Sequence, residues 1–162
     1  MSALNIKHGK NTNIHPSTTF NHVELGDNLK IAKDCIIHGS EEHTVKIGSN
    51  SILAMCTVID GTKAEIIIGN NVSLGQHSVL VSHINVPDSS KLNKLFPVTA
   101  APITIGDDTW TGSGCIFAPG VKVGRCCIVA SNSYVDEDIP DYSIYGGSPA
   151  KFIKKIDPKD IE

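Results

Sequence analysis

The chain has 162 residues, enough for one domain whose core needs no metal or disulfide. With a formal net charge of -3 and Arg125 as its one arginine, it has no general attraction to nucleic acid or an anionic membrane surface. No stretch approaches the about 18 apolar residues of a membrane span, and Met1 to Phe20 lacks the apolar core of a signal peptide.

The cysteines point to a reducing compartment. An odd number without CxxC spacing argues against both a disulfide framework and a zinc ribbon. The cysteines are Cys35, Cys56, Cys115, Cys126 and Cys127. We therefore expect reduced, mostly structural thiols in a cytoplasmic protein.

A repeat of six residues organises most of the chain. Large side chains recur at every sixth position in five triplets, with Thr111 as the one non-aliphatic member. They are Leu25, Ile31, Ile37; Ile47, Leu53, Ile59; Ile68, Leu74, Leu80; Ile105, Thr111, Phe117; and Val123, Val129, Val135. The next position is mostly Gly or Ala, with Asp60 and Asp136 as acidic exceptions. The fourth position after most of these large residues is small or medium in size.

Three six-residue units make one coil with three short faces. The large residue fills the interior, and the small residue after it fits a corner where backbone approaches backbone. Parallel strands of successive coils satisfy each other's hydrogen bonds. The pattern predicts an all-β solenoid, a parallel β-helix of about five triangular coils. An antiparallel sandwich would give alternation broken by irregular turns rather than a fixed period.

The repeat also divides the chain. We expect a single domain over 1–162, with an irregular N-terminal segment at 1–22 and a C-terminal tail at 141–162. Four extra residues fall between Ile37 and Ile47, three between Ile59 and Ile68, and nineteen between Leu80 and Ile105. The last insertion predicts an excursion loop at about 84–102. A loop of that length in a compact domain is usually functional or disordered.

Two residues bracket this excursion loop. His83 is the last residue before the chain leaves the prism, where it could serve as a general base or only cap a turn. Trp110 occupies an outward position and could form a wall of a ligand groove or only cover a loop. When the excursion loop is left out of the count, His83 and Trp110 are expected to lie only a few strand positions apart.

The segment from Pro102 to Ile156 resembles the bacterial hexapeptide-repeat acyltransferases, in particular maltose, galactoside and polysaccharide O-acetyltransferases. The resemblance rests on the runs Ile103–Gly114, Ala118–Gly124 and Gly146–Lys151. It implies a left-handed coil, acetyl-CoA as co-substrate, and homotrimers with active sites between neighbouring prisms.

The resemblance also implies roles for individual residues. His83 would deprotonate the acceptor hydroxyl during direct acetyl transfer, and the N–H groups of Gly112 and Ser113 would stabilise the oxyanion. The remaining cofactor contacts would be Trp110 and Ser131 along the acetyl and pantetheine end, and Lys151 and Lys154 near the phosphates. The two lysines could equally serve only the solubility of the tail.

The acceptor half departs from the family pattern. The family's sugar-binding asparagine falls near Leu53 and Met55, and Asp136 replaces a threonine that contacts pantetheine. Asp60 is retained, and with Asn85 and Asp88 of the loop it is expected to contact the acceptor. We expect O-acetylation of a sugar or surface-glycan precursor.

Three other functions use the same scaffold. A xenobiotic acetyltransferase would share the histidine, the loop and the tryptophan. A zinc enzyme like the γ-carbonic anhydrases needs three converging histidines, whereas His77 and His83 are six residues apart and belong to successive faces. A non-catalytic scaffold would need neither His83 nor Trp110. We therefore expect no metal.

Overall fold

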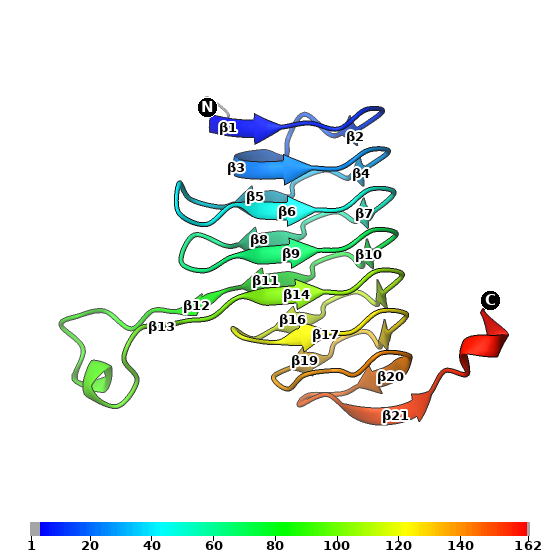
Figure 1. Cartoon of the computed structure of the whole chain (residues 1–162). Helices are drawn as coiled ribbons and strands as arrows, with labels where there is room; N and C mark the ends of the chain where they lie inside the picture. The colour runs from blue at the N-terminus through cyan, green and yellow to red at the C-terminus, as the bar shows by residue number, and fades with distance from the viewer. Residues whose placement is uncertain (1–3, 162) are drawn as a thin grey trace.

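The computed structural model describes residues 4–161 and shows a parallel β-solenoid with almost no helix. The coils stack along one axis, with β1 at one end and the C-terminal strand β21 at the other (Figure 1). Short strands of successive coils pair in parallel and form three faces of a prism. The expected all-β parallel β-helix is confirmed.

Each face is a stack of short strands. Face 1 consists of β1 (Leu4–Lys7), the second half of β3 (Thr19–Leu25), β6 (Val45–Ile47), β9 (Ile66–Ile68), β14 (Ile103–Ile105) and β17 (Lys122–Val123). Face 2 consists of β2 (Asn13–Ile14), β4 (Lys30–Ile31), β7 (Ile52–Leu53), β10 (Ser73–Leu74), β15 (Trp110–Thr111), β18 (Ile128–Val129) and β20 (Ser143–Gly146). Face 3 consists of the first half of β3, β5 (Ile36–His38), β8 (Val58–Asp60), β11 (Val79–Val81), β16 (Ile116–Phe117) and β19 (Tyr134–Val135).

Five elements lie outside these stacks. A two-stranded antiparallel hairpin of β12 (His83–Ile84) and β13 (Thr99–Ala100) carries the short 3-10 helix η1 (Lys91–Lys94). At the other end, β21 (Lys151–Lys155) pairs antiparallel with β20, and η2 (Pro158–Asp160) follows it.

The N-terminal region forms more structure than the sequence indicated. Strands β1, β2 and the start of β3 lie within the segment 1–22, which was expected to be irregular. They add a coil, so the prism has about six coils rather than about five. The repeat was missed because β3 turns from face 3 to face 1 at a single residue, His22, with φ of 50°.

The interior agrees with the six-residue pattern. All fifteen large residues of the five triplets are buried, and none is more than 6% exposed. The ten smaller residues at the fourth position are buried as well. They are Cys35, Ser51, Thr57, Val72, Ser78, Thr109, Cys115, Val121, Cys127 and Ser133. Aliphatic columns therefore run through the prism, and small side chains fill its corners.

Buried hydroxyls and thiols close many of these corners. The Thr57 hydroxyl donates to the carbonyl of Ala54 at 2.7 Å, and the Ser78 hydroxyl donates to that of Gly75 at 2.7 Å. The Cys115 thiol makes the equivalent bond to Gly112 at 3.2 Å. Each bond gives a carbonyl of the turn a hydrogen-bond donor inside the prism.

Asparagines form the turn between face 1 and face 2. Asn11, Asn28, Asn50 and Asn71 all have φ between 56° and 59°, in the left-handed region that asparagine tolerates better than most residues. The Asn28 amide donates to Asn50 at 3.0 Å across adjacent coils. The corner between faces 2 and 3 has the same backbone geometry at His77, with φ of 58°, so this histidine occupies a turn position.

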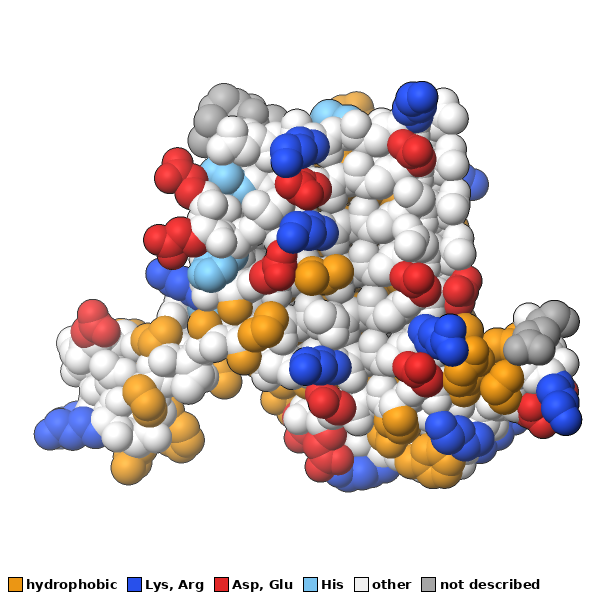
Figure 2. All heavy atoms as spheres, in the orientation of Figure 1, with side chains coloured by type: hydrophobic (Ala, Val, Ile, Leu, Met, Phe, Trp, Pro, Cys, Tyr) orange, Lys and Arg blue, Asp and Glu red, His pale blue; other side chains and the backbone are white. Residues whose placement is uncertain are grey.

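The outward side chains give each face a different character. Face 1 is charged in its N-terminal half: in Figure 2 basic and acidic side chains alternate there, including the pairs Lys7–Glu24 at 2.7 Å and Lys46–Glu65 at 2.6 Å. Face 3 has one outward column that is apolar beyond its first rung: Thr19, Ile36, Val58, Val79, Ile116 and Tyr134. Its second outward column, next to the insertions, is mostly polar: Asn21, His38, Asp60 and Val81. Face 2 is mixed, and its outward residues are Asn13, Lys30, Ile52, Ser73, Trp110, Ile128 and Ile144.

Two neighbouring isoleucines test this assignment of inward and outward positions. Ile66 is fully buried and Ile67 is 36% exposed. We expect Ile66→Ala to lower the free energy of unfolding by about 2–5 kcal/mol, because it leaves a cavity between coils. Ile67→Ala should cost less than about 1 kcal/mol. Urea unfolding followed by circular dichroism measures both, and equal losses would contradict the assignment.

Candidate active site

The three breaks in the repeat fall at one corner of the prism. The loops 39–44, 61–65 and 82–102 each join a face 3 strand to the next face 1 strand. In Figure 1 they leave the same side of the stack, and we call these residues the insertion edge. Insertions at one edge leave the ladders of all three faces intact, so this edge can vary without loss of the scaffold.

Ser82 anchors the longest insertion. Its N–H donates to the Asp60 carbonyl at 3.0 Å, and its own carbonyl accepts from the N–H of Ala101 at 2.9 Å. Its hydroxyl oxygen accepts from the N–H of Ala64 at 3.1 Å, and the residue is fully buried. Both ends of the excursion are thus fixed to the prism at one residue.

Beyond Ser82 the chain forms an arm that extends away from the prism (Figure 1). The antiparallel strands β12 and β13 make its base, with His83 opposite Ala100. Several large apolar side chains of the arm are exposed: Ile84, Leu92, Leu95, Phe96 and Val98. An arm with so much apolar surface is suited to contact a second surface.

His83 sits at the base of this arm. Its Nδ1 is buried and has no hydrogen-bond partner among the described residues, whereas Nε2 is not buried. The strand pairing of β12 and the neighbouring anchor at Ser82 fix its backbone. His83 therefore combines a fixed position with an imidazole nitrogen that a substrate hydroxyl can approach.

The expected acceptor contacts lie along the insertion edge but differ in availability. Asp60 is one coil from His83, and its Oδ1 already accepts from the N–H of Thr62 at 3.1 Å and from the Thr62 hydroxyl at 2.6 Å. Asn85 and Asp88 are exposed on the arm. Asp60 thus shapes a turn, while Asn85 and Asp88 are accessible from solvent.

Trp110 projects from face 2 and is 54% exposed. It lies beside a hollow of about 460 Å³ that is also lined by Asp108 and Cys126. Ile156 and Ile161 of the C-terminal segment close the same hollow. An indole beside a hollow of this size offers a flat apolar wall to a ligand.

The thiols are poor candidates for carrying an acyl group. Burial raises the pKa of the Cys126 thiol in the Trp110 hollow, and the nearby Asp108 carboxylate adds to that effect. Burial also raises the pKa values of Cys35, Cys115 and Cys127. These four thiols are therefore kept in the neutral form, which is the weaker nucleophile.

Gly112, Ser113 and Ser131 meet at the corner between faces 2 and 3. A Cβ on Gly112 would lie 2.5 Å from the backbone nitrogen of Ser131, so only glycine fits under this serine. The N–H of Gly112 donates to the Val129 carbonyl at 2.7 Å and is unavailable to an oxyanion. The N–H of Ser113 has no acceptor among the described residues and remains a candidate donor.

Lys151 and Lys154 lie on β21, at the C-terminal end of the prism. Both are exposed, and Lys151 Nζ is 3.3 Å from a Glu137 carboxylate oxygen. Such an exposed ion pair is weak, so the ammonium group can exchange its partner for a phosphate.

One chain does not bring these residues into a single site. His83 lies at the corner between faces 3 and 1, and the face 1 strand β14 separates it along the coil from Trp110 on face 2. The two residues lie a few strand positions apart along the looped-out chain, but on different sides of the prism. The hollow beside Trp110 contains no residue of the arm.

Sequence reasoning also missed a hollow on the N-terminal half of face 2. It measures about 550 Å³ and is lined by residues such as His15, Lys30 and Lys33. The signal was available in the outward positions of the repeat, where two lysines lie close together in the chain.

Two further searches concern metals and membranes. Within residues 4–161, no three His, Cys, Asp or Glu side chains are arranged to hold a metal ion. The described part of the chain therefore offers no set of ligands for the zinc of a γ-carbonic-anhydrase-like enzyme. The same residues contain no helix long and apolar enough to cross a membrane.

Comparison with known sequences places this chain beside acetyltransferases. Residues 102–137 match the family described as "Bacterial transferase hexapeptide (six repeats)". A probable acetyltransferase of Mycobacterium tuberculosis is 31% identical over 90% of this chain and 48% of its own length. The galactoside O-acetyltransferase of Lactococcus lactis is 31% identical over 65% of this chain and 50% of its own length.

Solved structures share the fold. The N-acyltransferase AntD of Bacillus cereus, in complex with dTDP and coenzyme A, gives a TM-score of 0.83 at 23% identity, covering 96% of this chain and 86% of its own. The GDP-perosamine N-acetyltransferase of Caulobacter crescentus, in complex with coenzyme A and GDP-perosamine, gives 0.69 at 25% identity, covering 89% and 57%.

These matches confirm the resemblance to hexapeptide-repeat acyltransferases that the motifs indicated. The chain spans between 31% and 50% of the length of the first four curated relatives.

Proposed function

We propose that this chain, which carries the transferase hexapeptide repeat, transfers the acetyl group of acetyl-CoA to a hydroxyl of a sugar or surface-glycan precursor. The observation that carries the proposal is His83, held at the base of the arm with an accessible imidazole nitrogen. A thioester donor and five free cysteines fit a reducing compartment, in keeping with the expected cytoplasmic location.

His83 acts as the general base. Its Nε2 takes the proton of the acceptor hydroxyl while the oxygen forms a bond to the thioester carbonyl carbon. The N–H of Ser113 donates to the oxyanion that develops on the carbonyl oxygen. As the carbon–sulfur bond breaks, the proton on His83 passes to the leaving sulfur, giving the acetylated acceptor and coenzyme A. The raised pKa values of the buried thiols fit this direct transfer, because no cysteine is needed as an acyl carrier.

The residues of the cofactor half fit acetyl-CoA. Trp110 and the hollow beside it would take the apolar pantetheine end, with Ser131 on the next coil. Lys151 and Lys154 would meet the phosphates, because both ammonium groups are exposed at the C-terminal end of the prism.

The active form is proposed to be a homotrimer. Face 3 has an apolar column of five residues, including Ile36 at 42% and Ile116 at 45% exposure, which suits burial against a second copy. His83 and Trp110 lie on different sides of one chain. A cyclic assembly can place the insertion edge of one copy against face 2 of the next and so complete the site.

A non-sugar acceptor is the second candidate. Relatives named chloramphenicol and probable macrolide acetyltransferase are 46% and 51% identical to this chain, but over only 56 and 51 residues. An acceptor panel of neutral sugars, amino sugars and chloramphenicol separates the candidates, with release of coenzyme A followed by a thiol reagent. Absence of both coenzyme A binding and release with every acceptor would contradict the proposed function.

A matched pair of histidine variants tests the base. We expect His83→Asn to lower turnover by about a hundredfold or more while the coenzyme A dissociation constant stays within about twofold. His77→Asn is the control, because His77 is exposed at a left-handed turn position that asparagine tolerates. Steady-state kinetics and calorimetry measure both. Full turnover by His83→Asn would remove this residue from the base role.

A second pair of variants tests the assembly. Wild-type chains should give three times the chain mass of 17.3 kDa in light scattering. Ile116→Glu should dissociate the trimer and abolish activity, because it buries an unpaired charge in the face 3 column. Ile67→Glu, on the charged face 1, should leave the mass unchanged. A trimer that survives Ile116→Glu would show that face 3 is not the interface.

A further inference from the structure

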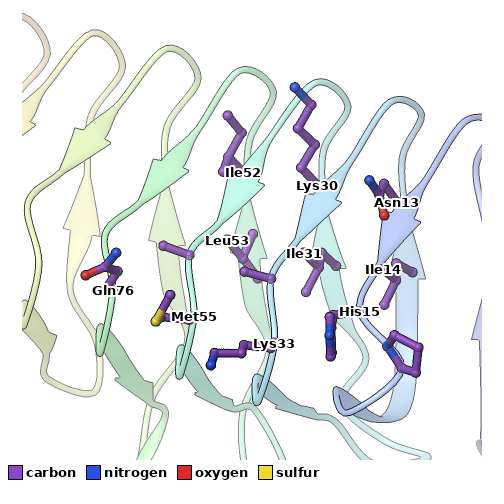
Figure 3. A pocket seen from close by; sticks show the side chains of 13 residues that line it. Asn13, Ile14, His15, Lys30, Ile31, Lys33, Ile52, Leu53, Met55 and Gln76 are labelled. Carbon is purple, nitrogen blue, oxygen red and sulfur yellow. The ribbon is translucent and has the colours of Figure 1, made fainter.

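The hollow on the N-terminal half of face 2 is large enough for a small ligand. Its volume of about 550 Å³ lies within the range of about 300–1,000 Å³ typical of ligand sites. Strands β2, β4 and β7 form its floor, and Gln76 lines it from the following coil. Figure 3 shows Lys30 at the strand end of the hollow, and Lys33 with His15 at the corner end.

The charge around this hollow is one-sided. Lys30 and Lys33 line it and are exposed, and no Asp or Glu is among its lining residues. Neither lysine forms an ion pair within residues 4–161. On face 1, by contrast, Lys7 and Lys46 each have a glutamate within 2.7 Å. Two cations without carboxylate partners give the hollow a positive potential that attracts an anion.

Apolar and hydrogen-bonding groups complete the lining. The Ile52 side chain is 43% exposed, and Met55 extends the apolar wall. His15 Nδ1 lies 2.9 Å from the Ser17 hydroxyl, an interaction that orients the ring and leaves Nε2 for a ligand. The hollow thus suits a molecule with both an anionic group and a ring that can pack on apolar side chains.

The hollow lies on the same face as Trp110. In the outward column of face 2, Ser73 lies between Ile52 and Trp110 and pairs with both. Two strand steps amount to about 10 Å. Because Ser73 is small, the surface between the hollow and the indole is not blocked by a large side chain. A ligand in the hollow can therefore extend toward the proposed acetyl site.

We infer that this hollow binds the acceptor and that the acceptor is a sugar bearing a phosphate group, with Lys30 or Lys33 as the cation that meets the phosphate. The identification of the bound molecule as the acceptor rests on the proposed function, whereas the binding of an anion in the hollow does not. The phosphate belongs either to a simple sugar phosphate or to a nucleotide sugar, and both sources share the chemistry that the two lysines recognise.

Binding of three probes tests the inference. We expect glucose 1-phosphate or UDP-glucose to bind the wild-type protein in calorimetry about tenfold or more tightly than glucose. The double variant Lys30→Gln, Lys33→Gln should lose about tenfold or more of that affinity. Lys122→Gln is the matched control, because Lys122 is an exposed lysine of face 1 without an ion pair in the described residues. The phosphate probe that binds more tightly identifies whether the phosphate group belongs to a sugar phosphate or to a nucleotide sugar.

Coenzyme A binding separates the two proposals. The double variant should bind coenzyme A as the wild type does. An equal loss of coenzyme A affinity would assign the hollow to the cofactor and overturn the acceptor assignment. Unchanged phosphate-probe affinity in the double variant would overturn it as well, even if the acetyl transfer by His83 stands. Phosphate binding that depends on the lysines, in a protein that fails to bind coenzyme A, would instead sustain the anion site and reject the proposed function.

Discussion

The close stacking of successive coils is the constraint on which the rest of the structure depends. Parallel ladders hold neighbouring backbones about 4.8 Å apart, and the corners leave no space for a large side chain. A Cβ on Gly48 would lie 2.5 Å from the backbone of Gly69, and one on Gly106 would lie 2.5 Å from that of Gly124. Small corner residues and buried hydroxyls therefore recur, and any insertion must leave the prism at a corner.

This constraint separates the scaffold from the function. Inward positions are restricted by stacking, whereas outward positions can vary and give each face its own chemistry. Two ion pairs lie on the N-terminal half of face 1, an apolar column runs along face 3, and face 2 carries both Trp110 and a basic hollow. The insertion edge carries His83, the proposed general base. The proposed enzyme thus uses one face of a copy to hold ligands and the edge of another copy to act on them.

The six-residue period predicted much of this. Every large inward residue of the repeat from Leu25 to Val135 is buried, and the three long loops between face 3 and face 1 lie at the three breaks in the repeat. The first coil escaped notice because β3 turns its corner at His22 alone and shortens the period. The separation of His83 from Trp110 could not be read from spacing, because a count along the chain does not tell which face a residue occupies. The Gly112 N–H was assigned to the oxyanion although the ladder already uses it.

The central claim is that His83 of one copy acts with Trp110 of another. Co-expression of the variants His83→Asn and Trp110→Ala tests it most directly, because each is expected to be nearly inactive alone. If the site lies between copies, each mixed trimer contains one site with both residues intact, and random mixing should restore about a quarter of the wild-type activity. If His83 and Trp110 of the same chain form the site, no mixed trimer contains an intact pair, and activity should stay at the level of the separate variants.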